Sequence, residues 1–140
     1  MDESWLEIRS YDGDGYKPLI DHGAWRVAIL RWEQSMLPEK IEYMERHTQT
    51  DEVFVLLKGH AMLILGGIGP QIKGVYQQVM EAGKIYNIKR NVWHSLVLSQ
   101  DASILIVENQ NTGKDNTEYN KISDDIKQSI LTTSIGDGRD

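Results

Sequence analysis

The succession of short apolar segments between Trp25 and Val107 constrains the fold of this chain most strongly. The segments are rich in Val, Ile, Leu, Tyr and Trp, the residues that pleated, half-buried strands favour. Turn-forming residues such as Pro38, Gly59 and Asn91 separate them. We predict strands at Trp25–Trp32, Ile41–His47, Glu52–Leu57, His60–Leu65, Val75–Met80, Ile85–Ile88, Val92–Leu98 and Ser103–Val107. Regular short strands of this kind indicate an all-β sandwich or barrel.

The length of 140 residues predicts a single domain, residues 1–140, with a barrel core at about 25–109. Residues 1–24 are predicted to be an N-terminal arm, in which Tyr11–Gly15 forms a plain turn. Residues 110–140 are predicted to hold a polar loop, a short C-terminal α-helix and a frayed tail.

The predicted helix begins after Ser123, a favoured N-cap residue followed by two aspartates. Ile126, Ile130 and Leu131 form an apolar stripe at helical spacing. We expect this stripe to pack on the exterior of the barrel or against a second subunit.

Composition limits the classes of partner. The formal net charge of −6 argues against nucleic acid, because phosphate binding needs a basic surface. Lys84, Lys89 and Arg90 could bind an anionic substrate, although solvated turn charges are the simpler interpretation. No apolar run reaches the ~18 residues of a membrane span, and the acidic N-terminus does not resemble a signal peptide. The absence of cysteine excludes disulfides and thiolate ligands and is typical of a cytoplasmic protein.

A candidate site lies in the stretch from Glu45 to Glu52. Because alternate residues of a strand share a face, Glu45 and His47 point to the same side. The polar turn after them returns Glu52 on the next strand, and His94 lies in another predicted strand. Two imidazoles with one or two carboxylates form a mixed N/O ligand set suited to one divalent transition metal.

The same residues resemble the two sequence motifs of the cupin superfamily. His47 stands at the second histidine of the first motif, four residues precede Glu52, and six separate Glu52 from Gly59. The segment from Gly83 to Leu98 is similar to the second motif, with His94 at its histidine. The resemblance covers roughly Trp25 to Asn109. Glu45 replaces the first histidine, Lys89-Arg90-Asn91 replaces the usual Pro-x-Gly turn, and Leu98 replaces the terminal Asn.

The resemblance implies a small cupin-like β-barrel (a double-stranded β-helix or jelly roll), often dimeric, with a metal inside. It implies His47, Glu52 and His94 as ligands of one ion, with Mn, Fe or Zn suited to a donor set that also includes Glu45. It does not imply one reaction, because a fold hosts many functions.

Three interpretations of Glu45 stay open at this point: a metal ligand, a catalytic acid or base beside the metal, or a partner of Arg46 or Arg26 without a functional role. Tyr43 shares its face and could donate a hydrogen bond to a substrate, or could pack in the core. Trp25, Trp32 and Trp93 are expected to serve the core or an interface rather than line a binding pocket.

The predicted function is that of a metal-dependent enzyme, an isomerase, lyase or oxygenase. Its substrate would be a small, polar, sugar-like or keto/hydroxy-acid compound. The alternative is a non-catalytic module of the same fold that binds or senses a small molecule. We expect a homodimer, in which residues 5–9 or the C-terminal helix cover apolar surface between two subunits.

Overall fold

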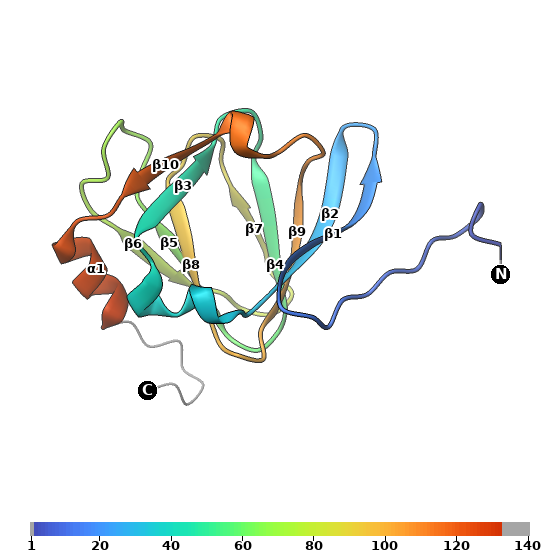
Figure 1. The fold of residues 1–140 in the computed structure, drawn as a ribbon, viewed down its shortest axis with the longest axis horizontal. Coiled ribbons are helices and arrows are strands. Elements are labelled where there is room, and N and C mark those ends of the chain that lie inside the picture. The colour runs from blue at the N-terminus through green and yellow to red at the C-terminus, as the bar shows by residue number, and fades with distance from the viewer. Residues whose placement is uncertain (1, 133–140) are drawn as a thin grey trace.

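The computed structural model describes residues 2–132 and contains two antiparallel sheets that enclose a barrel-like interior (Figure 1). One sheet has the strand order β1-β2-β9-β4-β7 and the other the order β10-β3-β8-β5-β6. The strands are β1 (Gly15–His22), β2 (Trp25–Arg31), β3 (Tyr43–His47), β4 (Glu52–Lys58), β5 (Ala61–Leu65), β6 (Tyr76–Val79), β7 (Ile85–Ile88), β8 (His94–Leu98), β9 (Ser103–Asn109) and β10 (Thr117–Lys121). This architecture confirms the predicted all-β class.

The helical elements are short. Three 3₁₀ turns, η1 (Gln34–Met36), η2 (Pro38–Lys40) and η3 (Lys114–Asn116), connect strands. The helix α1 (Asp124–Leu131) follows β10, and the Oγ atom of Ser123 caps it by accepting a hydrogen bond from the Ile126 amide at 3.2 Å. The expectation of a frayed tail at 136–140 lies outside the described residues. No helix in residues 2–132 is long and apolar enough to cross a membrane.

Two strands lie where the sequence predicted none. Strands β2 to β9 match the eight predicted segments within about two residues. In contrast, β1 occupies part of the predicted arm, residues 1–24, and β10 occupies the predicted loop after Asn109, so both predictions were wrong. Both are edge strands. Strand β1 contains Pro18, where the pairing register shifts, and β10 is mostly polar, so neither shows the alternation that marks a half-buried strand.

Each face of the second sheet packs against a separate apolar core. Its inner face packs against the first sheet, in a cluster that includes Phe54, Leu63 and Ile106. Its outer face lies under α1, where Ile126 and Ile130 are 7% and 0% exposed. The helix therefore packs on the exterior of its own barrel. Leu131, the third member of the predicted stripe, is 40% exposed and does not belong to this cluster.

Candidate metal centre

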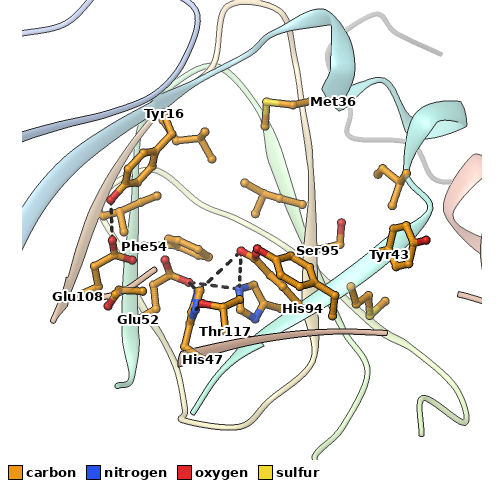
Figure 2. Close-up of a pocket in the computed structure, with 18 of the residues that line it drawn as sticks. Tyr16, Met36, Tyr43, His47, Glu52, Phe54, His94, Ser95, Glu108 and Thr117 are labelled. Carbon is orange, nitrogen blue, oxygen red and sulfur yellow. Dashed lines mark hydrogen bonds and ion pairs between the residues drawn. The ribbon is translucent and has the colours of Figure 1, made fainter. Parts of the chain in front are cut away.

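Four predicted site residues converge inside the barrel. Strand β3 presents Glu45 and His47 from one face, β4 begins with Glu52, and β8 begins with His94, which pairs directly with Glu45. Figure 2 shows His47, Glu52 and His94 at the base of a pocket of about 840 Å³. Tyr43 and the segment 112–114, between β9 and β10, also line this pocket.

Glu52 is the centre of the cluster. Its Oε1 atom lies 3.1 Å from His47 Nε2 and 3.2 Å from His94 Nε2. All three residues are at most 7% exposed. The Oε1 atom of Glu45 is farther away, 3.7 Å from His47 Nε2 and 3.9 Å from His94 Nε2, and its side chain is 41% exposed. The donor atoms of His47, Glu52 and His94 are therefore buried together, while the Glu45 carboxylate lies farther from the imidazoles and is partly exposed in the pocket.

Hydrogen bonds on the far side of each ring orient the imidazoles. The Nδ1–H group of His94 donates to the Val92 carbonyl at 3.0 Å, because that carbonyl can only accept. His94 Nε2 then carries a lone pair directed into the cluster. His47 Nδ1 is 3.0 Å from the hydroxyl of Thr117 on β10. Partners of this kind fix the tautomer and the angle of metal-binding histidines.

The donor set fits a divalent metal ion. Among the described residues, His47 Nε2 and Glu52 Oε1 are buried without a hydrogen-bond partner, although they are only 3.1 Å apart. Two ligand atoms at right angles on an ion, each about 2.1 Å from it, lie roughly 3.0 Å apart. The 3.1 Å separation of His47 Nε2 and Glu52 Oε1 matches this distance. The lack of a hydrogen bond between them is expected if both atoms direct a lone pair at the same ion. Two imidazoles and a carboxylate suit Mn, Fe or Zn.

Electrostatics hold Glu52 in its charged form. Burial alone would raise the pKa of Glu52, but the adjacent His47 and His94 imidazoles outweigh burial and lower the pKa below its usual range. Burial likewise opposes the charged form of the two imidazoles, yet the nearby Glu52 carboxylate raises the pKa of each. The cluster is therefore organised around one buried negative charge, as a cation site requires.

The structure adds two residues that the sequence analysis missed, Glu108 and Tyr16. Glu108 is 6% exposed, and its Oε2 accepts a hydrogen bond from the Tyr16 hydroxyl at 2.5 Å (Figure 2). Burial and the neighbouring Glu52 carboxyl raise the pKa of Glu108 to about 7. Glu45, His47 and His94 form one group whose ligand atoms lie within 4.8 Å of one another, and His47, Glu52 and Glu108 form another. The inward alternation Ile104, Ile106, Glu108 was the signal that could have revealed this carboxyl.

Two further predictions concerned Tyr43 and the arginine partners of Glu45. Tyr43 lines it and is 56% exposed, so the packing interpretation of this residue was wrong. Arg46 pairs with Glu118, and Arg26 pairs with Asp21, so neither arginine is used to neutralise Glu45.

The tryptophans and the basic residues considered in the sequence analysis lie away from the pocket. Trp25, Trp32 and Trp93 lie outside the pocket lining, and Trp93 is buried in the core under α1. The basic residues Lys84, Lys89 and Arg90 are exposed and do not line the pocket.

Structural comparison shows the same fold in distant proteins. A variant of Streptomyces PAC13 solved with uridine aligns with a TM-score of 0.56 and 7% identity over 85% of this chain and 87% of that one. KdgF from Halomonas sp. aligns with a TM-score of 0.51 and 10% identity over 69% of this chain and 78% of that one. Such low identity shows the fold alone. No curated protein matches the sequence.

A family model described as ureidoglycolate lyase matches residues 9–127 of the sequence. The match includes β1 and β10, the two strands that the sequence analysis did not predict, and every residue of the buried cluster. It also confirms the resemblance to the cupin superfamily. The chain belongs to the ureidoglycolate lyase family of cupin-like proteins.

Proposed function

We propose that this protein is a lyase acting on a small α-hydroxy acid whose hydroxyl-bearing carbon also carries an amide nitrogen. Ureidoglycolate, the compound in the family's description, is the first candidate. The observation that carries the proposal is the buried cluster of His47, Glu52 and His94 at the base of an 840 Å³ pocket. Among the three predicted reaction types, the family favours the lyase.

His47, Glu52 and His94 would hold one divalent ion, with Glu45 as a further carboxylate beside it. Such an ion polarises substrate oxygen atoms and lowers the free energy of developing negative charge. An α-hydroxy acid presents a carboxylate and a hydroxyl on adjacent carbons, which are the oxygen donors that Mn, Fe and Zn accept.

The chain's own residues would move the proton. Glu45, on the pocket side of the cluster, takes the proton of the substrate hydroxyl. As the C=O bond forms, the C–N bond breaks, and Glu45 returns the proton to the departing nitrogen. Ureidoglycolate thereby gives glyoxylate and urea without any oxidant or reductant. Tyr43, an exposed residue of the pocket lining, would donate a hydrogen bond to the substrate.

Turnover tests this assignment. Glyoxylate and urea are measured with the protein as purified, after treatment with a chelator, and after reloading with Mn, Fe or Zn. We expect metal-dependent release of both products. Glu45→Gln should lower kcat by about 100-fold or more while the metal is retained. Glu81→Gln is the matched control, because Glu81 is exposed and pairs with Lys84 outside the pocket.

Two results would decide against the enzyme. Tight binding of ureidoglycolate without turnover under any metal would favour the alternative, a non-catalytic binding or sensing module. The absence of both binding and turnover would contradict the proposed substrate class. The partner is proposed to be a small molecule and not nucleic acid or a membrane. The cytoplasmic location stays a prediction.

Metal content is tested separately from turnover. His47→Ala and His94→Ala should each remove most of the bound ion, because a centre with three protein ligands cannot lose one without a large loss of affinity. Elemental analysis of the purified variants measures this. His60→Ala is the control, since His60 is exposed and lies outside the pocket. Wild-type protein that retains no ion after incubation with Mn, Fe and Zn would refute the metal centre.

A further inference from the structure

The pocket is much larger than the compound in the family's description. Its volume is about 840 Å³, and pockets of about 300 to 1,000 Å³ usually hold drug-sized ligands. Ureidoglycolate has about nine non-hydrogen atoms. At the roughly 30 Å³ that one water molecule occupies in the liquid, these atoms would fill about 270 Å³. About two thirds of the pocket is therefore available to a further part of the substrate.

The central strands line the pocket with two layers of side chains. The first residues to face inward on β4, β8 and β9 are polar, and we call them the polar layer: Glu52, His94 and Glu108. Two positions farther along each strand, on the same face, lies the apolar layer: Phe54, Leu96 and Ile106. Phe54 pairs directly with Ile106, which keeps the layer level across these two strands. The step between the layers is about 7 Å along each strand.

Two further apolar side chains continue the pocket beyond the apolar layer. Leu30 on β2 and Met36 in η1 line the pocket and pack against the core that contains Phe54. Figure 2 shows Met36 at the end of the pocket opposite His47, Glu52 and His94. Leu30, Met36 and Leu96 are only partly buried, so apolar surface is left in contact with water. An apolar group of a ligand would remove that contact.

Polar groups that need a partner are confined to the base of the pocket. Among residues 2–132, the buried side-chain polar atoms without a hydrogen bond are His47 Nε2 and Glu52 Oε1, both in the metal centre. Lys40, Glu42 and Lys114 also line the pocket, but all three are exposed and can keep their hydration. Beyond the headgroup of the substrate, an apolar group is therefore the best match to the lining.

We propose that the pocket takes N-acyl-α-hydroxyglycines whose acyl group is an apolar chain. Ureidoglycolate shares the headgroup of this class and carries an amino group in place of the chain. The inference rests on the proposed lyase activity and names its substrate class. The carboxylate and hydroxyl of the headgroup lie at the polar layer, and the acyl chain lies along Phe54, Leu96 and Ile106.

The acyl chain leaves the proposed reaction unchanged. Glu45 takes the hydroxyl proton, the C=O bond forms, the C–N bond breaks, and Glu45 returns the proton to the departing nitrogen. The products are glyoxylate and the primary amide of the acyl chain, without any oxidant or reductant. Because the acyl carbonyl separates the chain from the reacting carbon, the chain contributes binding and takes no part in the bonds that change.

A series of acyl chains tests the apolar layer. Glyoxylate release is measured with the metal-loaded protein for ureidoglycolate and for the acetyl, butanoyl and hexanoyl members of the class. Each methylene group that is buried against the apolar layer should raise kcat/KM about fourfold. A kcat/KM that stays level or falls from the acetyl to the hexanoyl compound would overturn the proposal.

Met36→Gln tests whether this end of the pocket holds the chain. The change keeps the length of the side chain but adds an amide, so the ratio of kcat/KM for the hexanoyl compound to that for the acetyl compound should fall about threefold or more. Met36→Leu should keep the ratio. Leu131→Gln is the matched control, because Leu131 also lies in a helical element, is 40% exposed and is outside the pocket. An unchanged ratio in Met36→Gln, or an equal fall in Leu131→Gln, would count against the assignment. The wild-type series decides the question even if Met36→Gln does not fold.

A binding measurement separates the substrate class from the reaction. N-Hexanoylglycine and N-acetylglycine lack the hydroxyl and cannot react, so calorimetry with the metal-loaded protein reports on the apolar layer alone. Tighter binding of the hexanoyl compound would support the proposal, and an absence of turnover would then count only against the lyase. Equal affinities, or no binding of either compound, would overturn the proposal, while turnover of ureidoglycolate would still support the lyase.

Discussion

At the scale of single residues, the hydrogen bonds behind the imidazoles are as informative as the cluster itself. The Val92 carbonyl leaves His94 one possible tautomer, and the Thr117 hydroxyl, which can donate or accept, orients the ring of His47 from a neighbouring strand. A free imidazole would rotate and exchange tautomers. Here both rings are held before any ion binds, so less conformational entropy is lost on binding.

Thr117→Val tests this contribution. The change keeps the β-branched shape but removes the hydroxyl that contacts His47 Nδ1, so the affinity for the metal should fall about 10-fold to 100-fold. Competition with a chromophoric chelator measures the affinity. Thr48→Val is the control, because the Thr48 hydroxyl bonds the Asn116 carbonyl and does not touch an imidazole. Equal losses in the two variants would show a general effect of the loop and not an effect on the ring.

At the scale of elements, one turn ties the strands of the site together. Asn91, between β7 and β8, has a φ of 72° and donates its amide hydrogen to the His47 carbonyl at 2.8 Å. Asp51, just before β4, accepts hydrogen bonds from the Arg90 amide and the Asn87 side chain. The turn therefore links the ends of β3 and β4 to the start of β8, from which the three buried donors arise. Asparagine tolerates this left-handed conformation better than other non-glycine residues do.

Asn91→Ala should destabilise the fold by about 1 kcal/mol, since alanine has no local hydrogen bond to offset the left-handed backbone. Asn91→Gly should be neutral to within about 0.5 kcal/mol, because glycine adopts this conformation freely. Urea unfolding of the two variants under identical conditions gives both values. A larger cost for glycine than for alanine would contradict the backbone explanation and point to the Asn91 side chain instead.

At the scale of the whole molecule, the sheet that carries the histidines is packed on both faces. Leu63 and Leu98 belong to the inner core, while Met62 and Val97, their neighbours in sequence, belong to the core under α1. The helix is thus part of the support of β8 and β5, although it contributes no residue to the pocket lining.

Truncation of the helix contacts measures that support. Ile130→Ala should cost about 2 to 5 kcal/mol, because it removes a completely buried side chain and leaves a cavity. Leu131→Ala should cost less than about 1 kcal/mol, since Leu131 is 40% exposed and outside the cluster. Thermal or urea unfolding distinguishes the two. Similar losses would mean that helix propensity, and not burial, is what α1 contributes.

The sequence predicted the central strands because their alternation and turn residues are strong local signals. The edge strands were missed since β10 is polar and β1 contains Pro18, and their pairing depends on partners distant in sequence. The cluster of His47, Glu52 and His94 was expected from spacing. Glu108 was not, because the predicted strand ended one residue too early, at Val107, and Tyr16 lies on the unpredicted β1. Long-range pairing, which no local pattern encodes, brings these two residues together.

The segment 112–114 separates the lining of the pocket from its ion-binding donors. Thr112, Gly113 and Lys114 line the pocket, yet none belongs to the buried cluster. Asn116 anchors the segment through hydrogen bonds with the Gly113 amide and the Asn111 carbonyl. Mutations confined to these three positions can therefore change which molecules the pocket accepts while the ion-binding donors stay intact. Selectivity and chemistry would then be separable traits in evolution, and a small combinatorial library at these three positions is a natural route to new substrates.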